Sequence, residues 1–376
     1  MTFDLPRTML NALCVLASRR LEIQFDGLPH EFERVPMRKL LNWLLVELSA
    51  ILRPGRAWGR PTHLQVEPSS LCNLQCSFCP VTTGLQRSTG LMDFETFRKV
   101  FDEIAEYLFM VILWDWGEPF LNPEIYRMIR YAKRHDLRVI SSTNGHVFAK
   151  SDHPERLIES GIDTIIFAVD GLSQETYEQY RKGGSIETAL NGLERVVEAK
   201  RASGWPRPLI NLRFLAMRHN EHELPRLETF ARELGVDSFS IKTLNPYDQG
   251  ECHSTKENGL AYMPSDPHYQ RFEYDPRTGE RLRVRRNPCK RLWNNPLLSS
   301  DGKLVPCAFD PHHEYSFGDA TNKPFLEIWK DRPIVRLRRQ FRTNYRDLDL
   351  CANCTYAFKG GAPSTDTTVK VVRLHT

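Results

Sequence analysis

Three cysteines on one short stretch constrain this chain more than any other feature. Cys72, Cys76 and Cys79 form the pattern C-x3-C-x2-C shortly after an apolar segment expected to be a strand. Three thiolates on one tight loop can bind three irons of a cubane cluster and leave the fourth iron open. A structural zinc site normally has four ligands, and a disulfide within so short a loop would leave one cysteine over. The spacing therefore favours a [4Fe-4S] cluster with one open iron.

A second set of cysteines lies in the last third of the chain. Its pattern, C-x17-C-x43-C-x2-C, is formed by Cys289, Cys307, Cys351 and Cys354. Four thiolates suit a structural zinc ion as well as an iron-sulfur cluster, so both metals stay open at this point. Full cysteine ligation would leave no open iron, which favours electron transfer or structural support over substrate binding. Cys14 and Cys252 are expected to be ordinary thiols, with Cys14 buried.

Composition and charge indicate an ordinary globular protein in a reducing compartment. The net charge of +4 over 376 residues is too small to indicate a nucleic-acid partner. The start of the chain shows no secretory signal pattern, and no apolar run reaches the roughly 18 residues of a membrane span. We therefore expect a cytoplasmic protein, in which clustered cysteines are metal ligands more often than disulfides.

Strand and helix patterns alternate from residue 62 to residue 245. Apolar strand candidates lie at 64–66, 110–114, 137–141, 164–169, 209–215 and 238–242, and helical patterns separate them. Repeating strand-helix units imply a parallel sheet with right-handed crossovers. Six units are fewer than the eight of a closed barrel. The expected fold is therefore α/β, with a partial (β/α)6 barrel over 62–245.

The segments on either side of the barrel have different patterns. Apolar stripes at helical spacing around residues 10–16 and 40–52 predict a helical N-terminal extension over 1–61, without clear strands. This extension could pack on the barrel, or its second helix, with Arg53, Arg56 and Arg60 nearby, could make peripheral membrane contact. Residues 246–288 are expected to form linker and substrate-proximal loops, 289–360 a small metal-binding domain, and 361–376 a tail. A hairpin is expected over 297–305, with Asp301-Gly302 at its turn.

Further motifs follow the expected strands, at the edge of the sheet where ligands of α/β folds bind. They are Trp116-Gly117-Glu118-Pro119, Ser141-Ser142-Thr143-Asn144-Gly145, and Val169-Asp170-Gly171 followed by Tyr180-Arg181. Taken singly, Gly117 could be a turn residue and Asp170 a helix cap. Together with the aromatic Phe78 inside the cysteine loop, they resemble the radical S-adenosylmethionine (SAM) superfamily over residues 62–360. Trp116 departs from the family by replacing the first glycine of its Gly-Gly-Glu motif.

The resemblance implies a cofactor set and a chemistry. Cys72, Cys76 and Cys79 would bind the [4Fe-4S] cluster, and SAM would chelate its open iron. The implied SAM-contacting residues are Phe78, Trp116, Gly117, Glu118, Ser142, Asn144, Asp170 and Arg181. An electron from a donor such as flavodoxin or ferredoxin would cleave SAM to a 5′-deoxyadenosyl radical, which abstracts hydrogen from a substrate.

The second cysteine set also resembles part of this superfamily. Gly302 and Cys307 show the G-x4-C spacing of SPASM and twitch domains. Four cysteines instead of seven resemble the twitch version, which implies one auxiliary [4Fe-4S] cluster. The arrangement is similar to that of twitch-type aminocyclitol dehydrogenases, which implies oxidation of a small molecule such as a polyol, sugar or aminocyclitol.

Three alternatives to small-molecule oxidation remain. They are peptide maturation, membrane-associated lipid or glycan modification, and a non-enzymatic metal-binding role. Peptide maturases of this kind often carry an N-terminal winged helix that recognises the peptide, whereas the start of this chain looks helical. No catalytic base can be identified among the acidic and histidine residues of 245–290.

Overall fold

Six parallel strands in chain order form the centre of the computed structural model, which describes residues 5–244, 261–273, 275–278, 280–360 and 368–374. The strands are β3 (His63–Val66), β4 (Met110–Leu113), β5 (Arg138–Thr143), β6 (Thr164–Ala168), β7 (Leu209–Ala216) and β8 (Ser238–Thr243). Each pairs in parallel with the next. The expected α/β fold with a six-stranded parallel core is confirmed.

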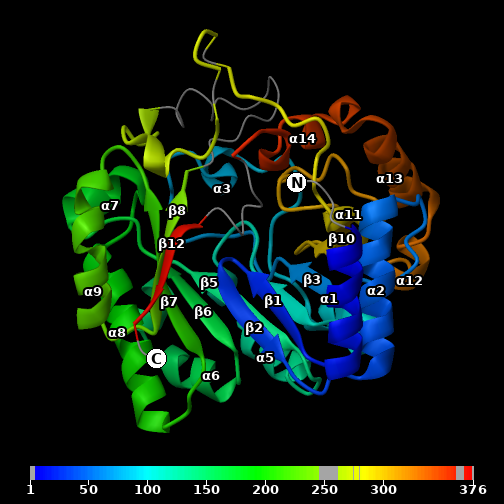
Figure 1. Cartoon of the computed structure of the whole chain (residues 1–376). Helices are drawn as coiled ribbons and strands as arrows, with labels where there is room; N and C mark the ends of the chain where they lie inside the picture. Colours follow the sequence, from blue (N-terminus) through cyan, green and yellow to red (C-terminus); the bar gives the residue numbers. More distant parts are fainter. Residues whose placement is uncertain (1–4, 245–260, 274, 279, 361–367, 375–376) are drawn as a thin grey trace.

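Helices connect these strands and cover the outside of the sheet (Figure 1). They are α3 (Pro80–Thr83), α4 (Phe94–Ile104), α5 (Ile125–Ala132), α6 (His153–Glu159), α7 (Gln174–Tyr180), α8 (Ile186–Ser203) and α9 (Leu227–Glu233). Side-chain caps fix where several begin: Asp93 accepts a hydrogen bond from the Thr96 amide at the start of α4, and Ser185 caps α8 in the same way. Short 3-10 helices cover Ala105–Tyr107, Pro119–Leu121, His146–Ala149, Glu221–Arg226, Pro267–Tyr269, Tyr345–Asp347 and Thr355–Ala357.

The sheet extends beyond the barrel strands at both edges. Strands β9 (Leu297–Leu298), β10 (Lys303–Val305) and β11 (Gly318–Asp319) continue it from β3, so the expected hairpin joins the barrel sheet. At the other edge β12 (Thr368–Arg373) pairs antiparallel with β8. The expectation of a tail over 361–376 therefore overlooks a strand, although three β-branched valines at 369, 371 and 372 offered a weak signal. Residues 361–367 lie outside the described part.

The N-terminal extension contains two strands as well as two helices. Its order is α1 (Leu5–Ser18), β1 (Leu21–Phe25), β2 (Leu28–Phe32) and α2 (Met37–Leu52). The expectation that it lacks strands is wrong, because β1 and β2 form an antiparallel hairpin. Its turn is Asp26-Gly27, both with positive φ, a pair typical of a two-residue hairpin turn. Leu21 and Phe25 pack on Met110 and Ile112 of β4, which ties the hairpin to the barrel.

Four further helices belong to the C-terminal part: α11 (Arg291–Asn294), α12 (Phe325–Ile328), α13 (Arg332–Asn344) and α14 (Asp349–Ala352). In Figure 1 these helices and α1 and α2 lie on one side of the sheet, and α7, α8 and α9 on the other. Cys14 of α1 is exposed, contrary to the expectation that it is buried. Within the described residues no helix is both long enough and apolar enough to span a membrane.

Candidate active site

The first cysteine set lies on a fixed loop after β3. Cys76 is buried, and Cys72 and Cys79 are half-buried. The Gln75 amide donates a hydrogen bond to the carbonyl of Lys182 (2.9 Å), and the Ser77 amide donates one to the carbonyl of Tyr180 (3.1 Å). Tyr180 is the last residue of α7, and Lys182 lies two residues after it. Backbone bonds to a second segment hold the loop in place before any metal binds.

The three thiols lie close enough together to affect one another. Burial, with a smaller contribution from the neighbouring cysteines, raises the pKa of Cys72 to about 11 and that of Cys79 to about 12. Burial also raises the pKa of Cys76, although the nearby Arg181 guanidinium opposes this shift. The thiols are therefore protonated at neutral pH, and ligation must displace their protons.

Gly117 allows the chain after β4 to approach the start of the cysteine loop. Its φ is +96°, and a Cβ at this position would lie 2.4 Å from the carbonyl oxygen of Ser69 and 2.7 Å from that of Leu71. The next amide, that of Glu118, donates to the Leu71 carbonyl at 2.8 Å. Only glycine fits both the backbone angle and the space.

Glu118 has a fully buried carboxylate that joins two strand ends. It accepts hydrogen bonds from the hydroxyl of Thr143 (2.9 Å) and the amides of Asn144 (2.8 Å) and Phe120 (3.2 Å). Burial raises the pKa of Glu118 to about 7, although these hydrogen bonds oppose the shift. A carboxyl with a pKa near neutrality in a site like this can carry or lose a proton under ordinary conditions.

The end of β5 reaches the cysteine loop through Asn144. Its side-chain amide donates to the Asn73 side-chain oxygen at 2.8 Å and lies 4.0 Å from the Cys72 sulfur. Ser142 lies half-buried on β5, two residues earlier. The expected strand-end residues therefore converge on the cysteine loop from β4 and β5.

Asp170 and Arg181 form a buried ion pair beside Cys76. Asp170 accepts from Arg181 Nε at 2.7 Å and Nη2 at 2.6 Å, and from the Leu215 amide at 2.8 Å. The Asp170 side chain is 1% exposed and that of Arg181 is 15% exposed. The aspartate thus orients the arginine, whose charge can face an anionic group of a bound cofactor.

Phe78 lies in an aromatic cluster that sequence reasoning found only in part. Its ring stacks on Tyr180 with centroids 4.8 Å apart and lies 5.3 Å from Tyr262. Tyr262 also donates a hydrogen bond to the hydroxyl of Ser77 at 3.0 Å. The sequence offered no signal for Tyr262, because nothing in it brings a residue so far along the chain to the cysteine loop.

Trp116, which departs from the family motif, points toward the second cysteine set. Its indole nitrogen donates to the carbonyl of Ala308 at 3.1 Å, next to Cys307. The side chain therefore links the end of β4 to the segment that carries Cys307.

The four later cysteines also come together. Each of Cys307, Cys351 and Cys354 has its pKa raised by burial and, to a smaller extent, by other members of the set. Asn287, a residue that the sequence did not indicate, donates to the Cys354 sulfur at 3.4 Å and accepts from the Cys289 amide at 2.9 Å. These sulfur atoms form a buried, thiol-only site with a polar neighbour.

Both cysteine sets offer thiol groups as their metal ligands. In the described part of the chain, no three His, Cys, Asp or Glu side chains are arranged to hold one metal ion. In a cubane each thiolate binds a different iron, so its sulfur ligands stand further apart than the four ligands of one zinc ion. The thiol-only composition of both sets fits an iron-sulfur cluster, whose usual protein ligands are thiolates.

The chain carries two known domains that account for this arrangement. Residues 66–227 match the radical SAM superfamily. Residues 289–355 match the SPASM family, described as an iron-sulfur cluster-binding domain. The chain is therefore a radical SAM enzyme with a C-terminal SPASM-type domain, and these domains imply SAM and [4Fe-4S] clusters as its cofactors.

Curated relatives of this chain have different activities. An AdoMet-dependent heme synthase of Methanosarcina barkeri is 23% identical over 74% of this chain and 85% of its own length. The PqqA peptide cyclase of Gluconobacter oxydans is 24% identical over 81% of this chain and 89% of its own. The mycofactocin maturase MftC of Mycobacterium ulcerans is 25% identical over 74% of this chain and 77% of its own length.

Solved structures show the same fold at low identity. Streptococcus suis SuiB is 16% identical, covers 94% of this chain and 83% of its own, and superimposes with a TM-score of 0.57. The structure of anSMEcpe with bound AdoMet is 15% identical to this chain and superimposes with a TM-score of 0.51. The match covers 82% of this chain and 93% of the anSMEcpe chain. At these identities the likeness supports the fold alone.

Proposed function

We propose that this enzyme cleaves SAM at a cluster held by Cys72, Cys76 and Cys79, abstracts hydrogen from an organic substrate, and passes an electron to an auxiliary cluster held by the four later cysteines. When bound, the first cluster and SAM together supply a 5′-deoxyadenosyl radical. The observation that carries the proposal is the convergence of Gly117, Glu118, Asn144 and Arg181 on the cysteine loop. An electron donor such as flavodoxin or ferredoxin and a reducing, cytoplasmic location are part of the same proposal.

Each neighbouring residue has a proposed task that follows from its contacts. Arg181, held by Asp170, would bind the carboxylate of SAM. Phe78, stacked on Tyr180, would lie against the adenine. The backbone around Trp116 and Gly117 would bind the methionine amine, and the Glu118 carboxylate holds this segment to the end of β5. Ser142 would contact the ribose.

For the substrate, we propose a small molecule of the polyol, sugar or aminocyclitol type. The four-cysteine set supports this choice, because a fully cysteine-ligated cluster suits the removal of an electron from a substrate radical better than substrate binding. The proposal also includes the domain limits expected from the sequence, 62–245 for the radical SAM partial barrel and 289–360 for the auxiliary-cluster domain.

A peptide substrate is the second candidate, and the N-terminal hairpin favours it. The helical start had argued against peptide recognition, but β1 has an edge without a neighbouring strand among the described residues. A cavity of about 310 Å³ lies beside it, and its walls include β1, Trp43, Lys290 and Asn294. Extended peptides bind such edges by adding a strand.

Iron counting and isotope transfer test these proposals separately. After anaerobic reconstitution we expect about eight irons per chain, and about four in a Cys351→Ala/Cys354→Ala variant. Four irons and one zinc in the unmodified enzyme would contradict the auxiliary cluster. Deuterium transfer into 5′-deoxyadenosine from a deuterated polyol, but not from a deuterated peptide, would support the small-molecule substrate; the opposite result would support the peptide.

A further inference from the structure

Helix α2 carries an exposed apolar row along its whole length. The row has helical spacing and consists of Met37, Leu41, Leu45, Leu48 and Leu52, which are between 37% and 57% exposed. Leu40 and Val46, on the opposite face, are completely buried against the rest of the protein. The 16 residues of α2 extend about 24 Å. Single exposed leucines are ordinary, but a continuous row on one helix indicates a surface that something covers.

The adjoining helix α1 adds to this surface. It lies beside α2 (Figure 1), and its Leu13 is 60% exposed. Its sequence, Leu5–Ser18, contains one charged residue, Arg7. Leu13 therefore adds an exposed apolar side chain beside the row of α2.

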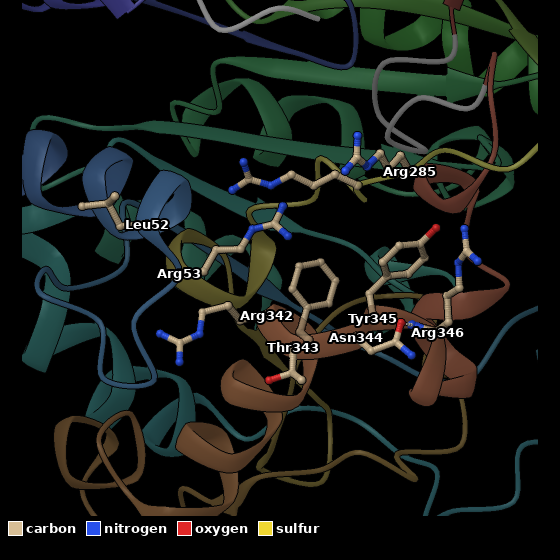
Figure 2. A pocket seen from close by; sticks show the side chains of 10 residues that line it. Leu52, Arg53, Arg285, Arg342, Thr343, Asn344, Tyr345 and Arg346 are labelled. Carbon is tan, nitrogen blue, oxygen red and sulfur yellow. Dashed lines mark hydrogen bonds between the residues drawn. The ribbon is translucent and has the colours of Figure 1, made fainter.

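A cavity rich in arginine lies at the carboxyl end of the same row. It has a volume of about 470 Å³, and Leu52 of the row is part of its wall. Figure 2 shows the side chains around it, which come from the end of α2, the end of α13 and the loop before α11. The arginines among them are Arg53, Arg285, Arg286, Arg342 and Arg346.

These arginines lack acidic partners among the described residues. Among the described residues, no carboxylate oxygen lies within 4.0 Å of a guanidinium nitrogen of these five arginines. Arg286 donates to the Ile51 carbonyl at 2.8 Å and Arg53 to the Asn287 carbonyl, so these two also cap nearby backbone. The Arg53 Nε atom is nevertheless buried without a hydrogen-bond partner, in a residue only 7% exposed. Helix capping accounts for part of this cluster but not for Arg285, Arg342 and Arg346.

We propose that the apolar row of α2 and the arginine cavity together bind the surface of an anionic phospholipid membrane. The leucines would lie at the boundary between headgroups and acyl chains, and the arginines would bind lipid phosphates. Charge complementarity favours this occupant, because a second copy of the chain would bring five more arginines to the contact. The apolar row distinguishes the surface from one built for a free phosphate, which the cavity alone could bind.

Vesicle flotation with the full-length, reconstituted enzyme tests the proposal. We expect flotation with vesicles of phosphatidylcholine and phosphatidylglycerol, and little with phosphatidylcholine alone. Arg342→Gln/Arg346→Gln should lower the partition coefficient about 30-fold, since each surface arginine contributes about fivefold. Leu45→Ser/Leu48→Ser should lower it by about tenfold or more. Binding should weaken with added salt.

Matched controls distinguish binding by this surface from non-specific effects of losing any exposed charge or any exposed apolar side chain. Trp205→Ser removes an apolar side chain that is 52% exposed just after α8, and Arg226→Gln removes an exposed charge at the start of α9. Both should float as the unmodified enzyme does, and thermal unfolding should show that all variants are folded. Equal flotation of the Leu45→Ser/Leu48→Ser variant and the Trp205→Ser control would overturn the proposal.

Two further outcomes would also overturn it. The first is a dimer in sedimentation experiments without lipid that becomes a monomer in Leu45→Ser/Leu48→Ser, since the row would then be an interface between copies. The second is binding of inorganic phosphate to the unmodified enzyme, lost in Arg342→Gln/Arg346→Gln, together with no flotation on either kind of vesicle, since the cavity would then bind a free phosphate and not a membrane.

Discussion

Replacing Gly117 with alanine tests whether the close approach of the strand end to the cysteine loop is real. A non-glycine residue at φ +96° costs about 1–2 kcal/mol. The new Cβ would lie 2.4 Å from the Ser69 oxygen and 2.7 Å from the Leu71 oxygen, both backbone atoms that cannot rotate away. Relieving such an overlap costs about 1–3 kcal/mol more. The variant should therefore lose about 2–5 kcal/mol of unfolding free energy.

Gly204→Ala is the matched control for this substitution. Gly204 also has a positive φ, +67°, but its Cβ would have no atom within 4 Å. It should lose only about 1 kcal/mol. Urea unfolding of both variants under anaerobic conditions measures the difference, about 1–4 kcal/mol. Equal losses would show that the Gly117 contact with Ser69 and Leu71 is not as described.

Three other changes test further contacts of the site. Asp170→Asn leaves Arg181 as a buried charge without its partner and should cost about 3–5 kcal/mol by urea unfolding, whereas Asp152→Asn, in an exposed pair, should cost less than about 1 kcal/mol; similar losses would refute the buried pair. Burial raises the pKa of Glu118 from 4.5 to about 7, so between pH 4.5 and 7 the folded protein holds a proton on Glu118 that the unfolded chain has lost. The unfolding free energy without SAM should therefore fall by up to about 3 kcal/mol as the pH rises from 4.5 to 7. Glu118→Gln should remove that slope, and an unchanged slope would assign it to another group. Trp116→Phe removes the hydrogen bond to Ala308 and should cost about 1 kcal/mol while perturbing the electron paramagnetic resonance signal of the auxiliary cluster; an unchanged signal would mean that the link has no effect there.

The barrel could be predicted from the sequence because its strands are buried on both faces and therefore appear as short, continuous apolar runs. Val111, Ile112 and Leu113 are all fully buried, as such a run predicts. Each expected strand from 64–66 to 238–242 overlaps an observed one. The N-terminal hairpin was overlooked because β1 and β2 have only five residues each and lie between two strongly apolar helices.

Only those residues of the candidate site that belong to sequence motifs could be predicted. Residues near strand ends, such as Gly117 and Asn144, could be placed at one edge of the sheet because parallel strands end there together. Contacts between distant segments could not be predicted, as Tyr262 beside Phe78 and Asn287 beside Cys354 show. The direction of the Trp116 side chain was equally beyond the sequence, because a motif position does not fix a rotamer.

The production of 5′-deoxyadenosine by Cys76→Ala tests the central claim most directly. The unmodified enzyme, reconstituted anaerobically and reduced with dithionite, should convert SAM to 5′-deoxyadenosine and methionine. Cys76→Ala should form no 5′-deoxyadenosine and retain about four irons per chain, those of the auxiliary cluster. Continued production by Cys76→Ala at the rate of the unmodified enzyme would contradict SAM cleavage at the cluster of Cys72, Cys76 and Cys79.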